Sequence, residues 1–168
     1  MADTMWDGRW GLQRLLPREE ARQAVREALK KYGVRNAERA DVWLVCCTGL
    51  FWRREYGKQW ARHVGTHPYI TAEYMKQDGA PKIARKAWEA SWRAGPDDPR
   101  VLAFWCNAGE HRSVAMAESY GQVMGCDVIH LCKSTWRWRS CGCCQECDPA
   151  RQDEGRSRAW AQFRAWMK

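Results

Sequence analysis

Three short apolar runs, separated from one another by helical patterns, most constrain what this chain can fold into. The runs span residues 41–46, 101–105 and 127–131 and have the length expected of buried strands. Parallel strands need long crossover connections, which are usually helices, so alternating strands and helices predict a parallel sheet covered by helices. The sequence therefore predicts a single compact α/β domain. Its small parallel or mixed sheet is flanked by helices on both faces, and a cysteine-rich appendage follows at the C-terminus.

Four segments carry the spacing of amphipathic helices. They span residues 17–33, 81–94, 112–124 and 154–167. Pro17 at the start and Gly33 at the end of the first segment are the residue types that favour a helix start and a helix stop. We divide the chain accordingly into an N-terminal helical extension (1–40), an α/β domain (41–135) and a cysteine-rich segment with a terminal helix (136–168).

Composition narrows the class of protein further. No apolar run is long enough to cross a membrane, and the first residues lack the basic and apolar segments of a secretory signal, so we expect a cytoplasmic protein without a membrane partner. In that reducing compartment the nine cysteines are metal ligands or nucleophiles more often than disulfides. The formal net charge of +8 favours anionic partners, RNA among them.

The loop after the second apolar run is the most informative segment, with the sequence CNAGEHRSVAMAE at residues 106–118. Loops between a buried strand and a helix bind ligands in α/β folds, because backbone N–H groups and a helix N-terminus converge there. Gly109 allows the loop to tighten, while Arg112 and Ser113 add a planar cation and a hydroxyl. The loop predicts a site for phosphate, sulfate or carboxylate, and a purely structural turn is the alternative.

Cys106 and Arg112 stand in the pattern Cys-x-x-Gly-x-x-Arg-Ser, which resembles the signature of the cysteine-dependent phosphatases. In those enzymes the arginine and the loop N–H groups bind the phosphate while the thiolate attacks phosphorus. Trp105 stands where those enzymes usually carry a histidine. Catalysis by Cys106 and Arg112 is therefore an alternative hypothesis, and a non-enzymatic role is the leading one.

The same loop also resembles the C-terminal domain of the RapZ family, the bacterial RNase adapters. The family's Cys-x-Gly-Gly-x-His-Arg-Ser-Val loop is matched by Cys106, Gly109 and residues 111–114, and the helix after it by Ala117 and Glu118. Weaker similarity covers residues 40–135. The resemblance implies a regulatory, RNA-binding domain with a pocket for a phosphorylated sugar, a nucleotide or a similar anion. Carried over to this chain, the ligand-binding residues are Asn107, Ala108, Gly109, His111, Arg112 and Ser113.

A cysteine cluster follows near the C-terminus. Cys141, Cys144 and Cys147 form a Cys-x-x-Cys-x-x-Cys run, and thiolates at this spacing suit tetrahedral zinc. We hypothesise a structural zinc ion on these three residues, with Cys132 as the fourth ligand or Cys143 in its place. An iron–sulfur cluster and free thiols are the alternatives.

Residues 133–139 alternate cations with tryptophans. If this strip is exposed, its cations would contact a nucleic-acid backbone and its indoles would stack on bases. If it is buried, the tryptophans would pack on the terminal helix while the basic side chains extend to solvent. The sequence leaves both possibilities open.

Overall fold

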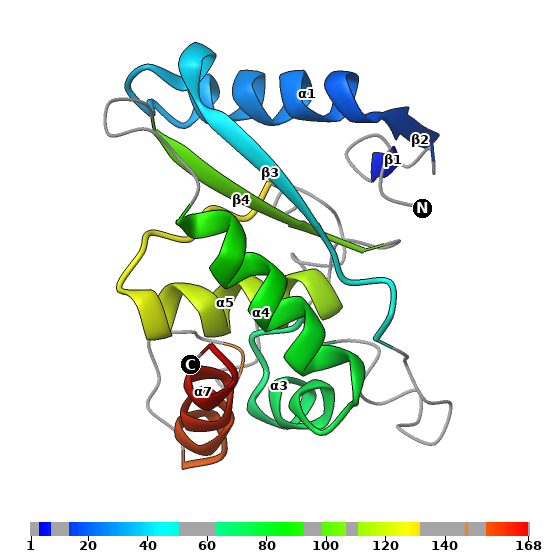
Figure 1. The fold of residues 1–168 in the computed structure, drawn as a ribbon, viewed down its shortest axis with the longest axis vertical. Helices are drawn as coiled ribbons and strands as arrows, with labels where there is room; N and C mark the ends of the chain where they lie inside the picture. The colour runs from blue at the N-terminus through cyan, green and yellow to red at the C-terminus, as the bar shows by residue number, and fades with distance from the viewer. Residues whose placement is uncertain are drawn as a thin grey trace.

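The structure is a computed structural model that describes residues 4–7, 14–50, 63–92, 99–106, 111–131, 147 and 154–167, with only the backbone of 4–7, 14–16 and 155. It shows an α/β fold with a small parallel sheet (Figure 1). Its elements in chain order are β1 (Thr4–Asp7), β2 (Arg14–Pro17), α1 (Arg18–Lys31), the 3-10 helix η1 (Ala37–Arg39), β3 (Asp41–Cys46), α3 (Pro68–Met75), α4 (Gly79–Ser91), β4 (Arg100–Trp105), α5 (Arg112–Met124) and α7 (Glu154–Trp166).

The central sheet is the parallel pair β3–β4. The two strands pair in register from Asp41 opposite Arg100 to Cys46 opposite Trp105. One further bond extends the pairing, because the N–H of Cys47 donates to the carbonyl of Trp105 at 2.8 Å. The carboxyl ends of both strands therefore lie at one edge of the sheet, next to the N-terminal end of α5 (Figure 1).

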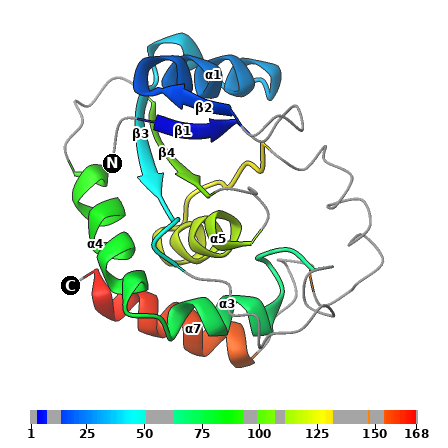
Figure 2. The same cartoon turned by 90° about the vertical axis from the view of Figure 1, so that its right-hand side faces the viewer.

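Helices cover both faces of the β3–β4 pair, as the sequence predicts. Along each strand the side chains alternate: Val42 and Val101 pack with Val25 and Leu29 of α1, whereas Val45 packs in a larger core on the opposite face. Helices α3, α4, α5 and α7 supply that larger core, and Figure 2 shows α1 on one side of the strands and these helices on the other. Within the described residues, no helix is long and apolar enough to cross a membrane.

The strongest sequence patterns formed the expected elements. The predicted helix 112–124 coincides with α5, and Gly125 follows it in the left-handed conformation that stops a helix. Gly33, with a φ of 75°, plays the same part after α1. Strand 41–46 is β3, and strand 101–105 is β4 with Arg100 added at its start.

Several elements were not predicted, among them a strand pair and the helix α3. Strands β1 and β2 form an antiparallel pair from Thr4 opposite Pro17 to Asp7 opposite Arg14, which precedes the helix expected in residues 1–40. Helix α3 lies in a stretch in which no element was predicted. It begins with Pro68, and the Nδ1 atom of His67 accepts a hydrogen bond from the N–H of Tyr69 at 3.2 Å, which satisfies one of the first N–H groups.

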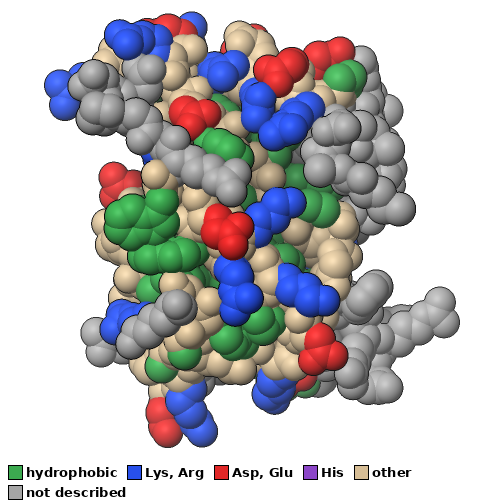
Figure 3. All heavy atoms as spheres, viewed as in Figure 1, with side chains coloured by type: hydrophobic (Ala, Val, Ile, Leu, Met, Phe, Trp, Pro, Cys, Tyr) green, Lys and Arg blue, Asp and Glu red, His purple; other side chains and the backbone are tan. Residues whose placement is uncertain are grey.

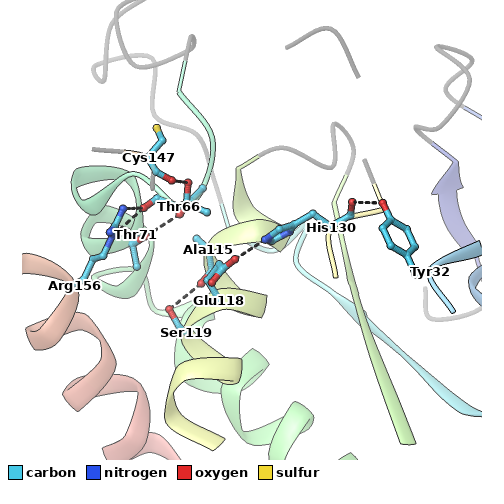
Figure 4. A network of polar contacts seen from close by, with 10 residues as sticks. Tyr32, Thr66, Thr71, Ala115, Glu118, Ser119, His130, Cys147 and Arg156 are labelled. Carbon is cyan, nitrogen blue, oxygen red and sulfur yellow. Dashed lines mark hydrogen bonds and ion pairs between the residues drawn. The ribbon is translucent and has the colours of Figure 1, made fainter. Parts of the chain in front are cut away.

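The predicted third strand, residues 127–131, is not formed: residues 126–130 have no regular structure, and 131 lies in a turn. Its apolar side chains are still used, because Ile129 and Leu131 pack against the α1-facing core. His130, within this run, contacts the side chains of Tyr32 and Glu118 and not a neighbouring strand. Its carbonyl accepts the hydroxyl of Tyr32 at 3.3 Å, and its ring contacts the Glu118 carboxylate at 2.5 Å (Figure 4). An apolar run identifies burial, but a strand also needs a partner for its backbone.

The segment before α3 packs directly against the first turn of α5, which predicts a sensitive position at Gly65. A Cβ atom there would lie 2.0 Å from the carbonyl oxygen of His111 and 2.5 Å from the nitrogen of Ala115. Both are backbone atoms, so Gly65→Ala should lower the free energy of unfolding by about 3 kcal/mol, measured by urea titration. A Cβ at Gly49 meets nothing within 4 Å, so Gly49→Ala should stay within about 0.5 kcal/mol of the wild type. Equal effects of the two substitutions would contradict this packing.

Candidate functional site

The residues that the sequence singles out most strongly lie where β3 and β4 end. Cys46 is the last residue of β3 and Cys47 follows it, Cys106 follows β4, and Arg112 begins α5 beside them. The structure thus places Cys106, His111, Arg112 and Ser113 at this edge of the sheet. The loop residues Asn107, Ala108 and Gly109 lie outside the described residues. Of the predicted ligand set, the structure therefore describes His111, Arg112 and Ser113.

Arg112 is anchored by backbone carbonyls from the chain that follows β3. One terminal nitrogen of its guanidinium donates to the carbonyl oxygen of Leu50 at 2.8 Å and to that of Thr48 at 3.3 Å. The guanidinium of arginine is planar and has donors on three nitrogens. These two bonds orient the guanidinium and use only one of its three nitrogens. The side chain is held at the first residue of α5, where the helix dipole also favours an anion.

Cys106 contacts Ser113, the residue that follows this arginine. Both residues are buried, and the sulfur of Cys106 is 3.3 Å from the hydroxyl oxygen of Ser113. Their burial has a clear local origin, because Cys106 follows the last residue of β4 and Ser113 lies in the first turn of α5. A hydroxyl placed there can donate to the sulfur or to a bound anion, which fits both functions considered for this loop.

His111 precedes the first helical residue of α5. Its side chain does not cap the helix, but its carbonyl accepts the N–H of Ala115 at 2.8 Å. The same carbonyl faces the backbone of Gly65, where the two segments approach most closely. His111 therefore lies where the segment before α3 packs against the start of α5.

A third thiol, that of Cys47, lies in the same group. Cys47 is fully buried, and its pKa is raised well above the usual value for a thiol. Burial is the largest cause, the thiols of Cys106 and Cys46 add to it, and the charge of Arg112 and the hydrogen bond to the Trp105 backbone oppose it. The Cys47 thiol is consequently protonated at neutral pH and is a poor nucleophile.

The structure describes one member of the predicted zinc set. Cys147 is buried, and its sulfur lies 3.5 Å from Nδ1 of His63. Cys132, Cys141 and Cys144 lie outside the described residues. Among the residues that are described, no group of three or more His, Cys, Asp or Glu side chains is arranged to hold a metal ion. The sequence analysis did not identify His63, because its only signal is a lone histidine 84 residues from Cys147.

Sequence reasoning also missed the two segments that line the candidate site. Thr48 and Leu50 contribute through backbone carbonyls, which no side-chain motif reveals. The segment 63–67 contributes through Gly65, whose small size is required by the backbone of α5. The only sequence signal for this segment was Gly65 itself, in a stretch without a predicted element. A glycine alone does not show that α5 packs against it.

No family model, curated protein or solved structure matches this chain. Its function must therefore be inferred from the residues at this edge of the sheet.

The thiol chemistry of the site leads to a labelling prediction. A brief treatment of the native protein with iodoacetamide at pH 7.5 should modify the exposed Cys126 and leave Cys47 unmodified, as measured by peptide mass spectrometry. Raising the pH to 9 should still leave Cys47 protected, because its pKa is raised and burial blocks the reagent. Unfolding in urea should make both react. Labelling of native Cys47 at the rate of Cys126 would contradict the burial of this thiol.

Proposed function

We propose that this protein is a binding module similar to the RapZ C-terminal domain, with a site for a phosphate-bearing small molecule at residues 106–113. The ligand would be a phosphosugar or a nucleotide. The observation that carries the proposal is the anchored guanidinium of Arg112 at the first residue of α5, beside the buried hydroxyl of Ser113. Asn107, Ala108, Gly109 and His111 complete the proposed ligand set by their place in the loop.

The anchoring of Arg112 favours phosphate over a neutral ligand. Two carbonyl contacts use one nitrogen of the guanidinium, and the donors on its other two nitrogens form a fork that matches two oxygens of one phosphate. A cation that is already held in place loses little rotational freedom when the anion binds. The partial positive charge at the start of α5 acts on the same ligand.

RNA is the second proposed partner, and the outer face of α4 is the described surface that suits it best. This face exposes Lys82, Arg85 and Lys86, and next to them Trp92 has 68% of its surface exposed. The space-filling view shows basic and apolar side chains side by side on the face over which α4 runs (Figure 3). Cations attract the phosphates of a single strand, and an exposed indole stacks on its bases.

The cysteine run carries a third part of the proposal. A zinc ion would be held by Cys141, Cys144 and Cys147, with Cys132 as the fourth ligand suggested by the sequence. A closed site of four protein ligands supports folding and provides no catalytic position. The thiol content also supports the proposal that the protein acts in the reducing cytoplasm.

The alternative function is a cysteine-dependent phosphatase with Cys106 as nucleophile and Arg112 on the phosphate. The contact between Cys106 and Ser113 favours it, because a hydroxyl that donates to a thiolate stabilises the charged, attacking form. The burial of Cys106 and the neighbouring protonated Cys47 favour a binding role instead.

Anion binding at this loop can be tested by thermal unfolding. Inorganic phosphate at a hundredfold excess over its dissociation constant should stabilise the wild type by about 2.7 kcal/mol, which corresponds to a rise in Tm of about 5–10 °C. Arg112→Ala should lose this response, measured against its own phosphate-free Tm, and Arg112→Lys should require more phosphate because a lysine presents no fork. The exposed Arg158 lies on α7, so Arg158→Ala should respond as the wild type does.

Two outcomes of that experiment would change the conclusion. A full phosphate response in Arg112→Ala would mean that the loop is only a turn. Cys106→Ala should keep most of the response if the loop binds without catalysis. Hydrolysis of p-nitrophenyl phosphate by the wild type, abolished in Cys106→Ser, would establish the phosphatase in its place.

RNA binding can be tested by fluorescence anisotropy with a labelled single-stranded RNA at several salt concentrations. The double substitution Lys82→Glu, Lys86→Glu should weaken binding and reduce the salt slope by roughly 0.7 for each phosphate that is no longer neutralised. Trp92→Ala should weaken binding by about 1–3 kcal/mol and leave the slope unchanged, because stacking releases no counterions. A control of equal charge is Lys30→Glu, Lys31→Glu at the end of α1. If that control weakens binding as much, RNA binding depends on the net charge of the protein and not on this face of α4.

A further inference from the structure

A thiol and an imidazole from distant parts of the chain meet beside the segment that precedes α3. The sulfur of Cys147 lies 3.5 Å from Nδ1 of His63, although the two residues are 84 positions apart. Cys147 is buried and His63 is half-buried, so the pair is largely withdrawn from solvent. Soft sulfur and imidazole nitrogen are the two ligand types that zinc combines most often in structural sites.

The separation of the two atoms fits a shared metal ion. Zinc–sulfur bonds of about 2.3 Å and zinc–nitrogen bonds of about 2.0–2.1 Å at a tetrahedral angle place the two ligand atoms about 3.6 Å apart. The 3.5 Å between the two atoms matches the edge of such a tetrahedron. The same distance also suits a weak hydrogen bond between a thiol and an imidazole, so a test must separate that bond from metal binding.

Hydrogen bonds tie the backbone of Cys147 to the segment that follows His63. The hydroxyl of Thr66 donates to the carbonyl of Cys147 at 2.6 Å, and Nε of the buried Arg156 donates to the carbonyl of Thr66 at 3.0 Å. Thr71 donates to the carbonyl of Gly65 at 2.8 Å, which fixes the same segment from α3. In Figure 4 the carbonyl of Cys147 points to Thr66 and its sulfur points away from this network. Supporting hydrogen bonds of this kind orient metal ligands.

His67 is close to this pair and is excluded as a ligand by its own hydrogen bond. Its ring centre lies 4.5 Å from that of His63. Its Nδ1 accepts the N–H of Tyr69, so a neutral ring carries its proton on Nε2 and has no lone pair left for a metal. The two neighbouring histidines therefore have separate roles: His67 caps α3, and His63 faces the thiol.

We propose that His63 and Cys147 are two ligands of one zinc ion and that His63, in place of Cys132 or Cys143, completes the cysteine set. The other two ligands would be Cys144 and Cys141, which the sequence places three and six residues before Cys147. The coordinating thiols release their protons to solvent when the ion binds. This inference rests on the zinc part of the proposed function and is independent of the anion site.

A closed Cys₃His site at this position would have a structural consequence. It would tie the cysteine run to the segment 63–67, which already packs against the first turn of α5 through Gly65. The metal would thereby support the backbone that packs against the start of α5, next to His111 and Arg112. Four protein ligands leave no position for a substrate, so the site would stabilise the fold.

The test compares metal content and cobalt spectra of full-length variants. Wild type purified under reducing conditions should contain close to one zinc per chain by plasma mass spectrometry. His63→Ala should bind zinc at least about a hundredfold more weakly in competition with a chelating dye, since removing even a residue that only supports a ligand weakens binding by about 10–100-fold. His67→Asn, which keeps an acceptor at the start of α3, should retain zinc as the wild type does. Arg112→Ala should also retain it, which separates this test from that of the anion site.

A rescue variant covers the case in which His63→Ala fails to fold. His63→Cys should restore zinc, and its Co²⁺ form should keep the sulfur-to-cobalt charge-transfer band while its visible bands move to lower energy, because thiolate is a weaker-field ligand than imidazole. Wild type without zinc and without a charge-transfer band on Co²⁺ addition would overturn the proposal and leave a thiol–imidazole hydrogen bond. Zinc binding unchanged by His63→Ala, or lost in His67→Asn, would also overturn it.

Discussion

The parallel, in-register pairing of β3 with β4 is the constraint on which the rest of this molecule depends. Because Cys46 lies opposite Trp105, the chain leaves both strands at the same level, and the residues that follow are neighbours. The pairing also sets which side chains face α1 and which face the larger core. A shift of one residue in this register would exchange those faces and would separate Cys47 from Cys106.

Two arginines, one on α5 and one on α7, connect their helices to distant segments in the same way. Arg112 donates to carbonyls 62 and 64 residues away, and the buried Arg156 donates to Thr66, 90 residues away. A guanidinium is costly to bury without partners, and carbonyls of irregular chain are themselves in need of donors. Each arginine therefore satisfies backbone that has no strand or helix to pair with.

The proposed anion site and the proposed metal site share one segment. Residues 63–67 contact His111 and Ala115 on one side and reach Cys147 and Arg156 on the other. With a metal bound as proposed, this arrangement would connect Cys147 to the start of α5, although the sequence separates the two. It also explains why Gly65 has no room for a side chain.

Local physics made part of this protein predictable from its amino acids. Helix 112–124 follows from apolar spacing and a left-handed Gly125, and strands 41–46 and 101–105 follow from continuous apolar runs, because these signals act between residues close in the chain. The third run, 127–131, carried the same signal and formed no strand, since a strand also requires a partner that the run cannot specify. The loop residues Arg112 and Ser113 were likewise identified by type and position. Their partners Leu50 and Thr48, the approach of Gly65 to α5 and the meeting of His63 with Cys147 depend on the path of the whole chain. Contacts across 60–90 residues arise when separate elements pack into one core, and no local pattern encodes them.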